Sequence, residues 1–333
     1  MRRATFTVML TLLLVGMLTF AVDVRQVSSE PATIIVPEDY PTIQEAINAA
    51  GDGDTVFARN GTYYEHVVVD RAISLIGEDL ETVIDGSSTG RCIWVRSNDV
   101  ELRGFTVRRG GVVNIDVSYV NGTLIKDNII RDVESYWGIS VSSSLNNTIE
   151  ENIVRNCGYG IFLESSSYNL IVRNALVNNS YGIILKTAPY NPKLPPPPPS
   201  SFNTIYHNNF MNNDVQAEDT GYSNVWNSSF EGNYWSNYNG TDTDGDGIGD
   251  TYLPWEDVDN YPFMRPYMWW NLADVNFDFK VDIYDIVLAV GTYGSKPSDT
   301  DWNPHCDIAE PYGITDIYDV VMIVGSFGEE YNP

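Results

Sequence analysis

Cysteine, histidine and basic residues are scarce in this chain of 333 residues, and each scarcity excludes a class of protein. The three cysteines lie far apart and form no CxxC pair, so the sequence indicates neither a disulfide framework nor a zinc site. Lysine and arginine number 19 against 45 aspartates and glutamates, which leaves a formal net charge of −26. This charge argues against nucleic acids and anionic membranes as partners and favours cations.

Long apolar runs are also rare. The sequence contains one, near its N-terminus. Arg2 and Arg3 precede an apolar run that extends from about residue 4 to residue 22, as in an export signal. The run is almost long enough to span a bilayer, and no clear Ala-x-Ala cleavage site follows it. We therefore expect residues 1–30 to be a signal peptide or a membrane anchor, and the rest of the chain to be secreted or displayed at the cell surface.

An internal repeat organises residues 31–240. The segments TIEENIVRNCGYGIFLESSSY and LIVRNALVNNSYGIILKTAPY superpose with a period of 22 residues, pairing Ile149 with Ile171, Asn152 with Asn174, Gly160 with Gly182, Ile161 with Ile183 and Leu163 with Leu185. An earlier unit contains Ile125, Asn128, Gly138, Ile139 and Val141, and a later unit contains Ile205 and Asn208. Short β-branched runs separated by Asn, Gly and Ser predict a parallel β-helix, whose coils stack about 4.8 Å apart.

Equivalent residues of stacked coils form ladders, so the repeat predicts which side chains are neighbours. We expect a structural ladder at a bend of the coil, formed by Asn128, Asn152, Asn174 and Asn208. The last repeat follows an insertion that contains Pro195–Pro199, which we interpret as a stiff loop that leaves the solenoid.

The first coil needs a cover for its apolar interior. Thr42 and Glu45 match a helix-capping pattern, and Gly51 is placed to end the helix. Between them one apolar helical face is formed by Ile43, Ala46, Ile47 and Ala50. The sequence therefore predicts a short amphipathic helix that covers the N-terminal end of the solenoid.

These motifs also carry a resemblance to a known family. PTIQEAI, followed by Gly53–Val56 (GDTV), Gly61–Tyr63 (GTY) and Ile73–Gly77 (ISLIG), is similar to the start of pectin-lyase-like right-handed parallel β-helices. Residues 233–250, NYWSNYNGTDTDGDGIGD, further resemble the NosD-like and carbohydrate-binding, sugar-hydrolase branch of that superfamily. The resemblance implies an all-β right-handed solenoid. It leaves the chemistry open, because this scaffold serves lyases, hydrolases and proteins that only bind.

The ladders allow a search for an active site. The position before the asparagine ladder holds a column of mixed charge, Asp127, Glu151, Arg173 and His207, which is typical of solvent-facing ion pairs. No pair of carboxylates flanked by a base emerges, so enzyme activity stays undecided. A second column contains Trp137, Tyr159 and Tyr181, which either stack on one another for stability or bind the apolar faces of sugars.

NosD-like proteins are associated with copper delivery, and the resemblance raises that possibility. Copper sites use His, Met and Cys ligands. The three histidines, His66, His207 and His305, are dispersed along the sequence, as are the methionines. The sequence therefore does not predict a copper site.

An acidic loop follows the repeats. Positions 1, 3, 5, 7 and 9 of a calcium-loop pattern are matched by Asp242, Asp244, Asp246, the Ile248 carbonyl and Asp250. Position 12 is Leu253, and Pro254 prevents a following helix. The missing ligand must then come from Glu256, Asp257 or Asp259. We interpret residues 241–270 as a calcium clamp and linker.

Residues 271–333 contain a duplication with a spacing of 34 residues, which aligns Asp282 with Asp316 and Asp285 with Asp319. In each copy a loop leads into an amphipathic helix, with apolar residues Ile283, Ile286, Val287, Val290 and Tyr293 in the first and Ile317, Val320, Val321, Val324 and Phe327 in the second. The first loop offers calcium ligands at Asp274, Asn276, Asp278, the Lys280 carbonyl, Asp282 and Asp285. The second offers Asp307, Asp316 and Asp319, with Glu310 and a carbonyl near Gly313 as further candidates.

Phe279 at loop position 6 and Asp285 at position 12 depart from the EF-hand pattern, and this region resembles the dockerin module. The resemblance implies bound Ca²⁺, a small α-helical domain and a cohesin-like partner. We therefore predict an exported protein that binds or processes polysaccharide and docks through this module. Two alternatives stay open: a non-catalytic surface protein in which the β-helix is a rigid spacer, and a polysaccharide lyase or glycoside hydrolase.

Overall fold

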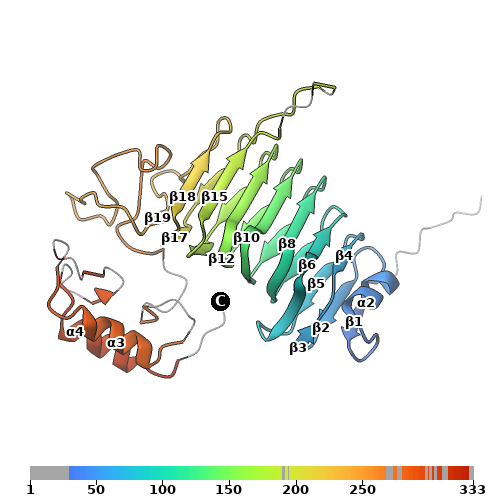
Figure 1. Cartoon of the computed structure of the whole chain (residues 1–333), viewed down its shortest axis with the longest axis horizontal. Helices are drawn as coiled ribbons and strands as arrows, with labels where there is room; N and C mark the ends of the chain where they lie inside the picture. Colours follow the sequence, from blue (N-terminus) through green and yellow to red (C-terminus); the bar gives the residue numbers. More distant parts are fainter. Residues whose placement is uncertain are drawn as a thin grey trace, which may run out of the picture. The chain divides into compact units, whose positions relative to one another are not determined.

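The computed structural model describes residues 30–189, 192–193, 195–267, 273–275, 280–296, 299, 302–303, 306–309 and 314–329, apart from the side chain of residue 134 (Figure 1). The chain divides into Met1–Ala32 and Thr33–Pro333, and every element described below belongs to the second unit. The expected signal or anchor segment lies outside the described residues. Among the helices that are described, none has the length and apolar character needed to cross a membrane.

Two parallel sheets form the body of the structure (Figure 1). The eight-stranded sheet contains β1 (Thr33–Val36), β2 (Thr55–Ala58), β5 (Ser74–Gly77), β7 (Glu101–Arg103), β9 (Leu124–Lys126), β11 (Thr148–Glu150), β13 (Leu170–Val172) and β16 (Thr204–Tyr206). The eleven-stranded sheet contains β3 (Gly61–Tyr63), β4 (Val67–Val69), β6 (Thr82–Val95), β8 (Thr106–Ser118), β10 (Ile129–Ser142), β12 (Ile153–Glu164), β14 (Ala175–Val177), β15 (Tyr181–Lys186), β17 (Asn209–Met211), β18 (Val215–Asp219) and β19 (Tyr234–Trp235). The chain alternates between the sheets and builds the predicted right-handed parallel β-helix.

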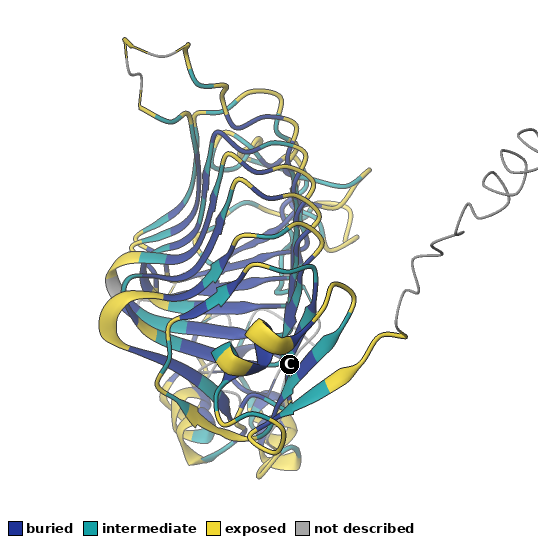
Figure 2. Cartoon of the chain, turned by 90° about the vertical axis from the view of Figure 1, so that its right-hand side faces the viewer, coloured by how far each residue is buried: buried dark blue, intermediate teal, exposed yellow. Residues whose placement is uncertain are grey.

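The register confirms the repeat read from the sequence. Ile149 pairs with Ile171 between β11 and β13, and Ile161 pairs with Ile183 between β12 and β15. The inward side of the long strands carries a ladder of fully buried isoleucines, Ile93, Ile115, Ile139, Ile161 and Ile183. Figure 2 shows that the buried faces of both sheets line the interior of the coil. Strand alternation therefore separates a continuous apolar core from an outer surface that is free to carry function.

The asparagine ladder is present and longer than predicted. The Asn128 side-chain amide donates to the Asn152 carbonyl oxygen at 3.0 Å, and the same bond links Asn152 to Asn174 and Asn174 to Asn208. Asn208 then donates to Asn233 at 3.0 Å. A second ladder, which the sequence analysis missed, joins Asn147, Asn169, Asn203 and Asn224. These buried amides satisfy the backbone groups at two bends of each coil.

The predicted covering helix is α2 (Ile43–Ala49), at the N-terminal end of the solenoid. Thr42 is its N-cap and accepts a hydrogen bond from the Glu45 backbone at 3.1 Å. The Glu65 carboxylate accepts from the first two helical N–H groups, those of Ile43 and Gln44, at 3.0 Å each. Its inward side chains, Ile43, Ala46 and Ile47, are fully buried in the core.

Aromatic side chains close the other end of the solenoid, which the sequence analysis did not assign. Phe210 and Trp235 stack with ring centroids 4.2 Å apart and planes 7° apart, and Trp226 lies 6.0 Å from Trp235. All three are at most 2% exposed. The rings belong to the same buried cluster as the core isoleucines and shield this end of the interior from water.

Two helices follow in the C-terminal part, α3 (Ile283–Gly291) and α4 (Ile317–Gly325). Each begins with a reciprocal capping box, Asp282 with Asp285 and Asp316 with Asp319. The duplication predicted from the sequence is therefore also present in the structure. A small core between the helices is formed by Ala273, Val275, Val281, Ala289, Cys306, Ile308 and Ile323.

Candidate functional site: an aromatic face and acidic loops

The predicted aromatic column lies on the outer side of β10, β12 and β15. Trp137 and Tyr159 stack with centroids 6.1 Å apart and planes 25° apart, and Tyr159 stacks on Tyr181 at 5.2 Å and 15°. Phe162 contacts the column at 5.7 Å from Trp137. All four rings are partly exposed. Stacking occupies much of each ring face, so this arrangement supports the structural interpretation and leaves the ring edges for a ligand.

The same outer side continues toward the N-terminus with arginine and tryptophan. Arg91 occupies the column of Trp137, with Val113 between them, and Trp94 occupies the column of Phe162. The guanidinium carbons of Arg91 and Arg96 lie 4.8 and 4.5 Å from the Trp94 ring centroid. We call Arg91, Trp94, Arg96, Trp137, Tyr159, Phe162 and Tyr181 the aromatic face. Cation–π contacts hold both guanidiniums over Trp94; Arg91 also pairs with Asp116, whereas Arg96 keeps an exposed charge that can meet an anion.

Carboxylates beside this face are already neutralised by arginine. Asp116 is 6% exposed and pairs with Arg91. Asp85 has a fully buried side chain that accepts from Arg108 at 2.8 Å and Arg109 at 2.9 Å. Burial would raise the pKa of Asp85, but hydrogen bonds from the Ser87 backbone and both arginines outweigh it and hold the pKa below its usual value. Both carboxylates are therefore paired with arginine, which does not suit a general acid.

The predicted column of mixed charge is confirmed in part: Glu151 and Arg173 form an ion-pair network on the other sheet, whereas His207 is buried and pairs with Glu231 outside the column. Glu151 accepts from Lys126 at 2.7 Å and from Arg173 at 2.7 Å, and both cations also contact Glu150. Burial would raise the pKa of Glu151, but the two cations keep it low. Partly exposed pairs of this kind stabilise a fold by at most about 1 kcal/mol each. We assign this column to stability between coils.

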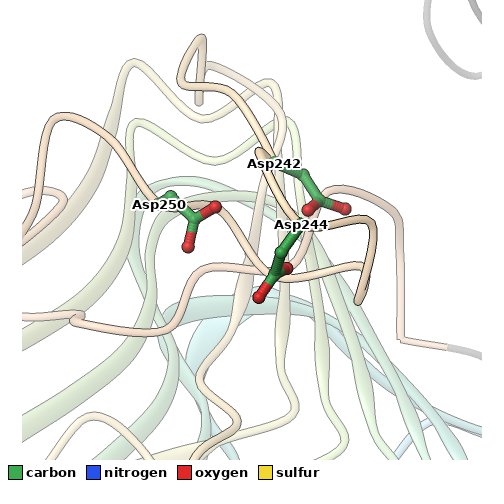
Figure 3. A group of neighbouring side chains, drawn as sticks. All are labelled: Asp242, Asp244 and Asp250. Carbon is green, nitrogen blue, oxygen red and sulfur yellow. The ribbon is translucent and has the colours of Figure 1, made fainter.

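The acidic loop 242–250 brings three of its predicted ligands together. Ligand oxygens of Asp242, Asp244 and Asp250 all lie within 4.8 Å of one another, and this is the only such cluster of metal-binding side chains in the described part of the chain. Figure 3 shows that the three carboxylates lie close together on the exposed loop. A set of oxygen ligands suits Ca²⁺ or Mg²⁺.

Backbone N–H groups preorganise this loop. Asp242 accepts from the N–H of Gly245 at 2.7 Å and of Gly247 at 2.9 Å, and Gly247 has a φ of +88°, which favours glycine. Gly247 stands at position 6, where calcium loops use glycine for a sharp turn. Hydrogen bonds from the Thr243 side chain and backbone lower the pKa of Asp250.

The loop is attached to the last coil. Ile248 forms an antiparallel bridge with Phe263, and Phe263 forms a parallel bridge with Tyr234 of β19. Asp246, however, lies outside the carboxylate cluster, and its Oδ1 accepts from the Ile248 N–H at 2.8 Å.

Asp259, one of three candidates for the missing ligand, has a different role. It is fully buried and accepts hydrogen bonds from Asn233, Trp235 and Tyr261, so its oxygens are already occupied. Glu256 accepts from Asn237 at 2.8 Å. The candidate Asp259 is therefore wrong as a ligand, because the carboxylate points into the end of the solenoid.

The predicted ligands in the C-terminal part fall into two groups. Asp282 and Asp316 cap their helices, whereas four other carboxylates are strongly buried: Asp274 at 1%, Asp285 at 0%, Asp307 at 8% and Asp319 at 0% exposure. Lys280 lies at the entry to α3. Asn276, Asp278, Glu310 and Gly313 lie outside the described residues. Burying four carboxylates in so small a core requires compensating positive charge or protonation.

The apolar residues of α3 and α4 are mostly exposed, contrary to what an amphipathic helix packed on a core would show. Only one residue of each apolar set, Ile286 and Val320, packs against the small core. The remaining large apolar residues are 38–65% exposed: Ile283, Tyr284, Val287, Leu288, Val290 and Tyr293 in the first copy, and Ile317, Tyr318, Val321, Met322, Val324 and Phe327 in the second. We call these two surfaces the helix faces. Exposed apolar patches of this kind mark interaction sites.

Comparison with known families now places the solenoid. Residues 48–240, more than half of the chain, match the sequence model of the family described as periplasmic copper-binding protein (NosD). The chain belongs to the NosD family. The match covers the coils and ends just before the acidic loop, so it includes the aromatic face but neither the loop nor the helix faces. Comparison with curated protein sequences gives no match.

Solved structures similar to this NosD-family chain include two lyases and a viral protein, all of low sequence identity. Pectate lyase Pel9A is 12% identical, with 62% of this chain and 75% of that chain covered and a TM-score of 0.42. An alginate lyase from Paenibacillus sp. str. FPU-7 is 14% identical, with 61% and 98% covered and a TM-score of 0.38. ORF18 of Geobacillus virus E2 is 13% identical, with 50% and 38% covered and a TM-score of 0.40. This chain thus spans well under half of the viral protein.

Copper does not fit the ligands that the structure describes in this NosD-family chain. His66 contacts the Arg91 carbonyl and Thr89, whereas His207 contacts Glu231 and stacks on Tyr267, so the two rings lie in separate environments. Burial raises the pKa of both Cys92 and Cys157 to about 12, which disfavours the thiolate that binds metal. The one cluster in the described residues offers only carboxylates, which are poor copper ligands.

Proposed function

We propose that this chain is an exported NosD-family protein that attaches to a partner protein through a calcium-dependent, dockerin-like C-terminal module. The observation that carries the proposal is the pair of helix faces. Equivalent residues of the two copies are exposed to similar extents, as in Tyr284 (65%) and Tyr318 (60%), or Val287 and Val321 (59% each). Two equivalent apolar faces of this size in a chain of net charge −26 favour a protein partner.

Calcium is the cofactor that the buried carboxylates support. Asp319 illustrates the point, because one of its oxygens accepts from the Ile308 and Ala309 N–H groups and the other caps α4. Backbone donors compensate a buried carboxylate only in part; Asp285 accepts from the Asp282 backbone at 2.8 Å, and Asp307 has the Arg265 guanidinium at 4.0 Å. A divalent cation in each loop would neutralise these groups and couple ion binding to folding of the module. The loop at Asp242, Asp244 and Asp250 would hold a third Ca²⁺ as a clamp at the end of the coils.

The test is binding of the full-length chain to immobilised cohesin domains in calcium and in chelator. Wild type should bind only in calcium. Because the faces are equivalent, Val287→Asp and Val321→Asp should each retain binding, whereas the double variant should lose it. Thr62→Asp, on an exposed position of β3, is the matched control for added charge. Binding that persists in chelator, or that survives the double variant, would contradict the proposal.

Polysaccharide binding is a second function, which the aromatic face favours. The exposed charge of Arg96, held over Trp94, and the partly exposed edges of Trp137 and Tyr159 together suit a sugar chain that carries acidic groups. We test it by glycan-array binding of wild type and of the double variant Trp137→Ala, Tyr159→Ala. Tyr119→Ala, which removes a ring that is 80% exposed elsewhere on the coil, is the control.

The outcome of the array also separates the other interpretations. Loss of binding in the double variant but not in the control supports a saccharide site. Absence of binding in wild type supports the rigid spacer. Product formation from uronate-rich polymers in the presence of calcium would instead establish a lyase or hydrolase. The arginine pairing of Asp85 and Asp116 argues for binding without catalysis.

A further inference from the structure

A second aromatic column, absent from the sequence analysis, lies at the turns that lead into the eight-stranded sheet. Tyr168 and Phe202 stack at 5.2 Å with planes 9° apart, and Phe202 contacts Tyr222 edge-on at 6.2 Å. The three residues come from successive coils. The backbone N–H of Tyr168 donates to the Ser201 carbonyl, and the backbone N–H of Phe202 donates to the Tyr222 carbonyl. Their exposed fractions are 57%, 47% and 64%. We call Tyr168, Phe202 and Tyr222 the turn ladder.

The turn ladder is unfavourable for the isolated chain. Tyr168 and Phe202 have φ angles of +59° and +56°, in the left-handed region, where a bulky residue costs roughly 1–2 kcal/mol. The equivalent residue one coil earlier is Asn146, with φ +54°, a residue that tolerates this conformation. Stacking contributes only about 0.5–1.5 kcal/mol per pair. Tyr119 shares the left-handed φ and the exposure, so the distinctive feature of the turn ladder is that its rings contact one another across coils and form one exposed apolar surface. A surface of this kind points to a contact outside the solenoid.

The proline run Pro195–Pro199 is the second feature that the proposed functions leave unexplained. Four of its five residues are exposed. The loop that carries it joins β15 to β16 and projects beyond the turns of neighbouring coils (Figure 1). Its base is fixed, because Ser201 donates to the Pro199 carbonyl at 3.1 Å and Ser200 donates to the Lys186 carbonyl at 2.8 Å. Consecutive prolines adopt a preformed polyproline II helix, which loses little entropy on binding.

The spacing of the two features matches. Tyr168 and Tyr222 lie two coils apart, a rise of about 9.6 Å at about 4.8 Å per coil, with Tyr222 one residue before the strictly equivalent Ser223. A polyproline II helix repeats every three residues at about 3.1 Å each, or about 9.3 Å. Prolines three apart, such as Pro195 and Pro198, can therefore contact Tyr168 and Tyr222 at once. Aromatic surfaces are the usual receptors of such helices.

We infer that the turn ladder of one molecule binds the proline run of a second copy of this chain. The run and the ladder are both exposed in the single chain rather than covering each other. Since each copy has both features, two copies can exchange them and form a twofold dimer with two identical contacts. This pairing is independent of the helix faces and of calcium.

Sedimentation velocity of the full-length chain over a range of concentrations tests the pairing. Wild type should form a reversible dimer, and Phe202→Asn should weaken it at least about tenfold. Asparagine suits the left-handed backbone, so this variant should melt at the wild-type temperature or above. Tyr119→Asn is the matched control, because Tyr119 is also exposed and has a φ of +61° but lies outside the turn ladder. It should dimerise like wild type.

Complementation makes the test specific. The triple variant Pro196→Ser, Pro197→Ser, Pro198→Ser should be monomeric, like Phe202→Asn. Mixing the two variants should restore association, since the first keeps its ladder and the second keeps its run. A synthetic peptide of residues 193–201 should compete with the wild-type dimer. A monomeric wild type, a dimer insensitive to Phe202→Asn, or no association in the mixture would overturn the inference.

Discussion

Asp259 provides the sharpest test of how this solenoid is stabilised. The asparagine ladder donates in one direction, from Asn128 to Asn233, and therefore needs an acceptor at its end. Asp259 supplies it, because one oxygen accepts from the Asn233 backbone at 2.7 Å and the Trp235 indole at 2.8 Å, and the other from the Tyr261 backbone at 2.9 Å. Replacing Asp259 by alanine leaves these donors without an acceptor inside a fully buried site.

The expected loss of stability follows from these contacts. A buried donor that loses its partner costs about 1–3 kcal/mol, and three donors are affected. After partial relaxation we expect Asp259→Ala to lower the free energy of unfolding by about 3–5 kcal/mol. Asp259→Asn keeps the shape and one acceptor oxygen, so about 2–3 kcal/mol is expected. Burial raises the pKa of Asp259, and the three donors oppose that rise. The same donors therefore reduce the free-energy cost of burying the ionised carboxylate.

Urea unfolding followed by tryptophan fluorescence measures this loss, and hydrogen exchange locates it. Exchange should accelerate first in β16, β17 and β19, because coils of a solenoid contact only their neighbours. Asp257→Asn is the matched control, since Asp257 is exposed and lies two residues away. An unfolding midpoint of Asp259→Ala equal to that of wild type would refute the role of the carboxylate as ladder terminator.

Three further predictions concern calcium, pH and the acidic loop. Chelation should unfold the C-terminal module and leave most of the β-sheet signal in circular dichroism, because uncompensated carboxylates repel one another; identical calorimetric traces with chelator and with calcium would contradict this. Burial lowers the pKa of His207 more than Glu231 raises it, so the folded protein favours the neutral imidazole. The stability that this preference contributes is complete above about pH 6.5, the pKa of an unperturbed histidine. It is lost as the pH falls toward the lower pKa that His207 has in the folded protein. The melting temperature of wild type should therefore drop between pH 7 and pH 5 more than that of His207→Asn, and parallel profiles would exclude His207 as the cause. Gly247→Ala should weaken Ca²⁺ binding by the acidic loop about fivefold to tenfold in calorimetry, since φ +88° strains alanine; Gly291→Ala, a helical position with open space around it, should leave that binding unchanged.

Much of the solenoid could be predicted from the sequence because a repeat contains its own register. Once Ile149 was aligned with Ile171, the strand pairing and the asparagine ladder followed from the constant rise between coils. Local capping chemistry likewise predicted α2, and the apolar periodicity after each acidic loop predicted α3 and α4. These features depend on residues near one another in the chain or related by a fixed period.

The candidate sites were predicted less completely, for a different reason. Asp259 reads as one more acid beside the calcium loop, yet the fold carries it into the end of the core. Tyr168 and Phe202 stand 34 residues apart because the proline insertion lengthens one coil, so the 22-residue period does not align them. The exposure of a helix face depends on what packs against it, and Val287 and Val321 have the pattern of core residues although both are 59% exposed.

The sequence by itself determined the solenoid, its register, the covering helix and the duplicated C-terminal helices, because period, strand alternation and capping act over short distances or at a constant spacing. Tertiary structure alone decided which charged groups are paired, which aromatic rings face solvent and which carboxylate ends the ladder. Burial and hydrogen-bond partners arise from segments that meet only after the coils have stacked. Two aspartates illustrate the contrast. The place of Asp242 in the acidic loop can be predicted from residue spacing, whereas the role of Asp259 is visible only in the folded structure, at the closed end of the solenoid.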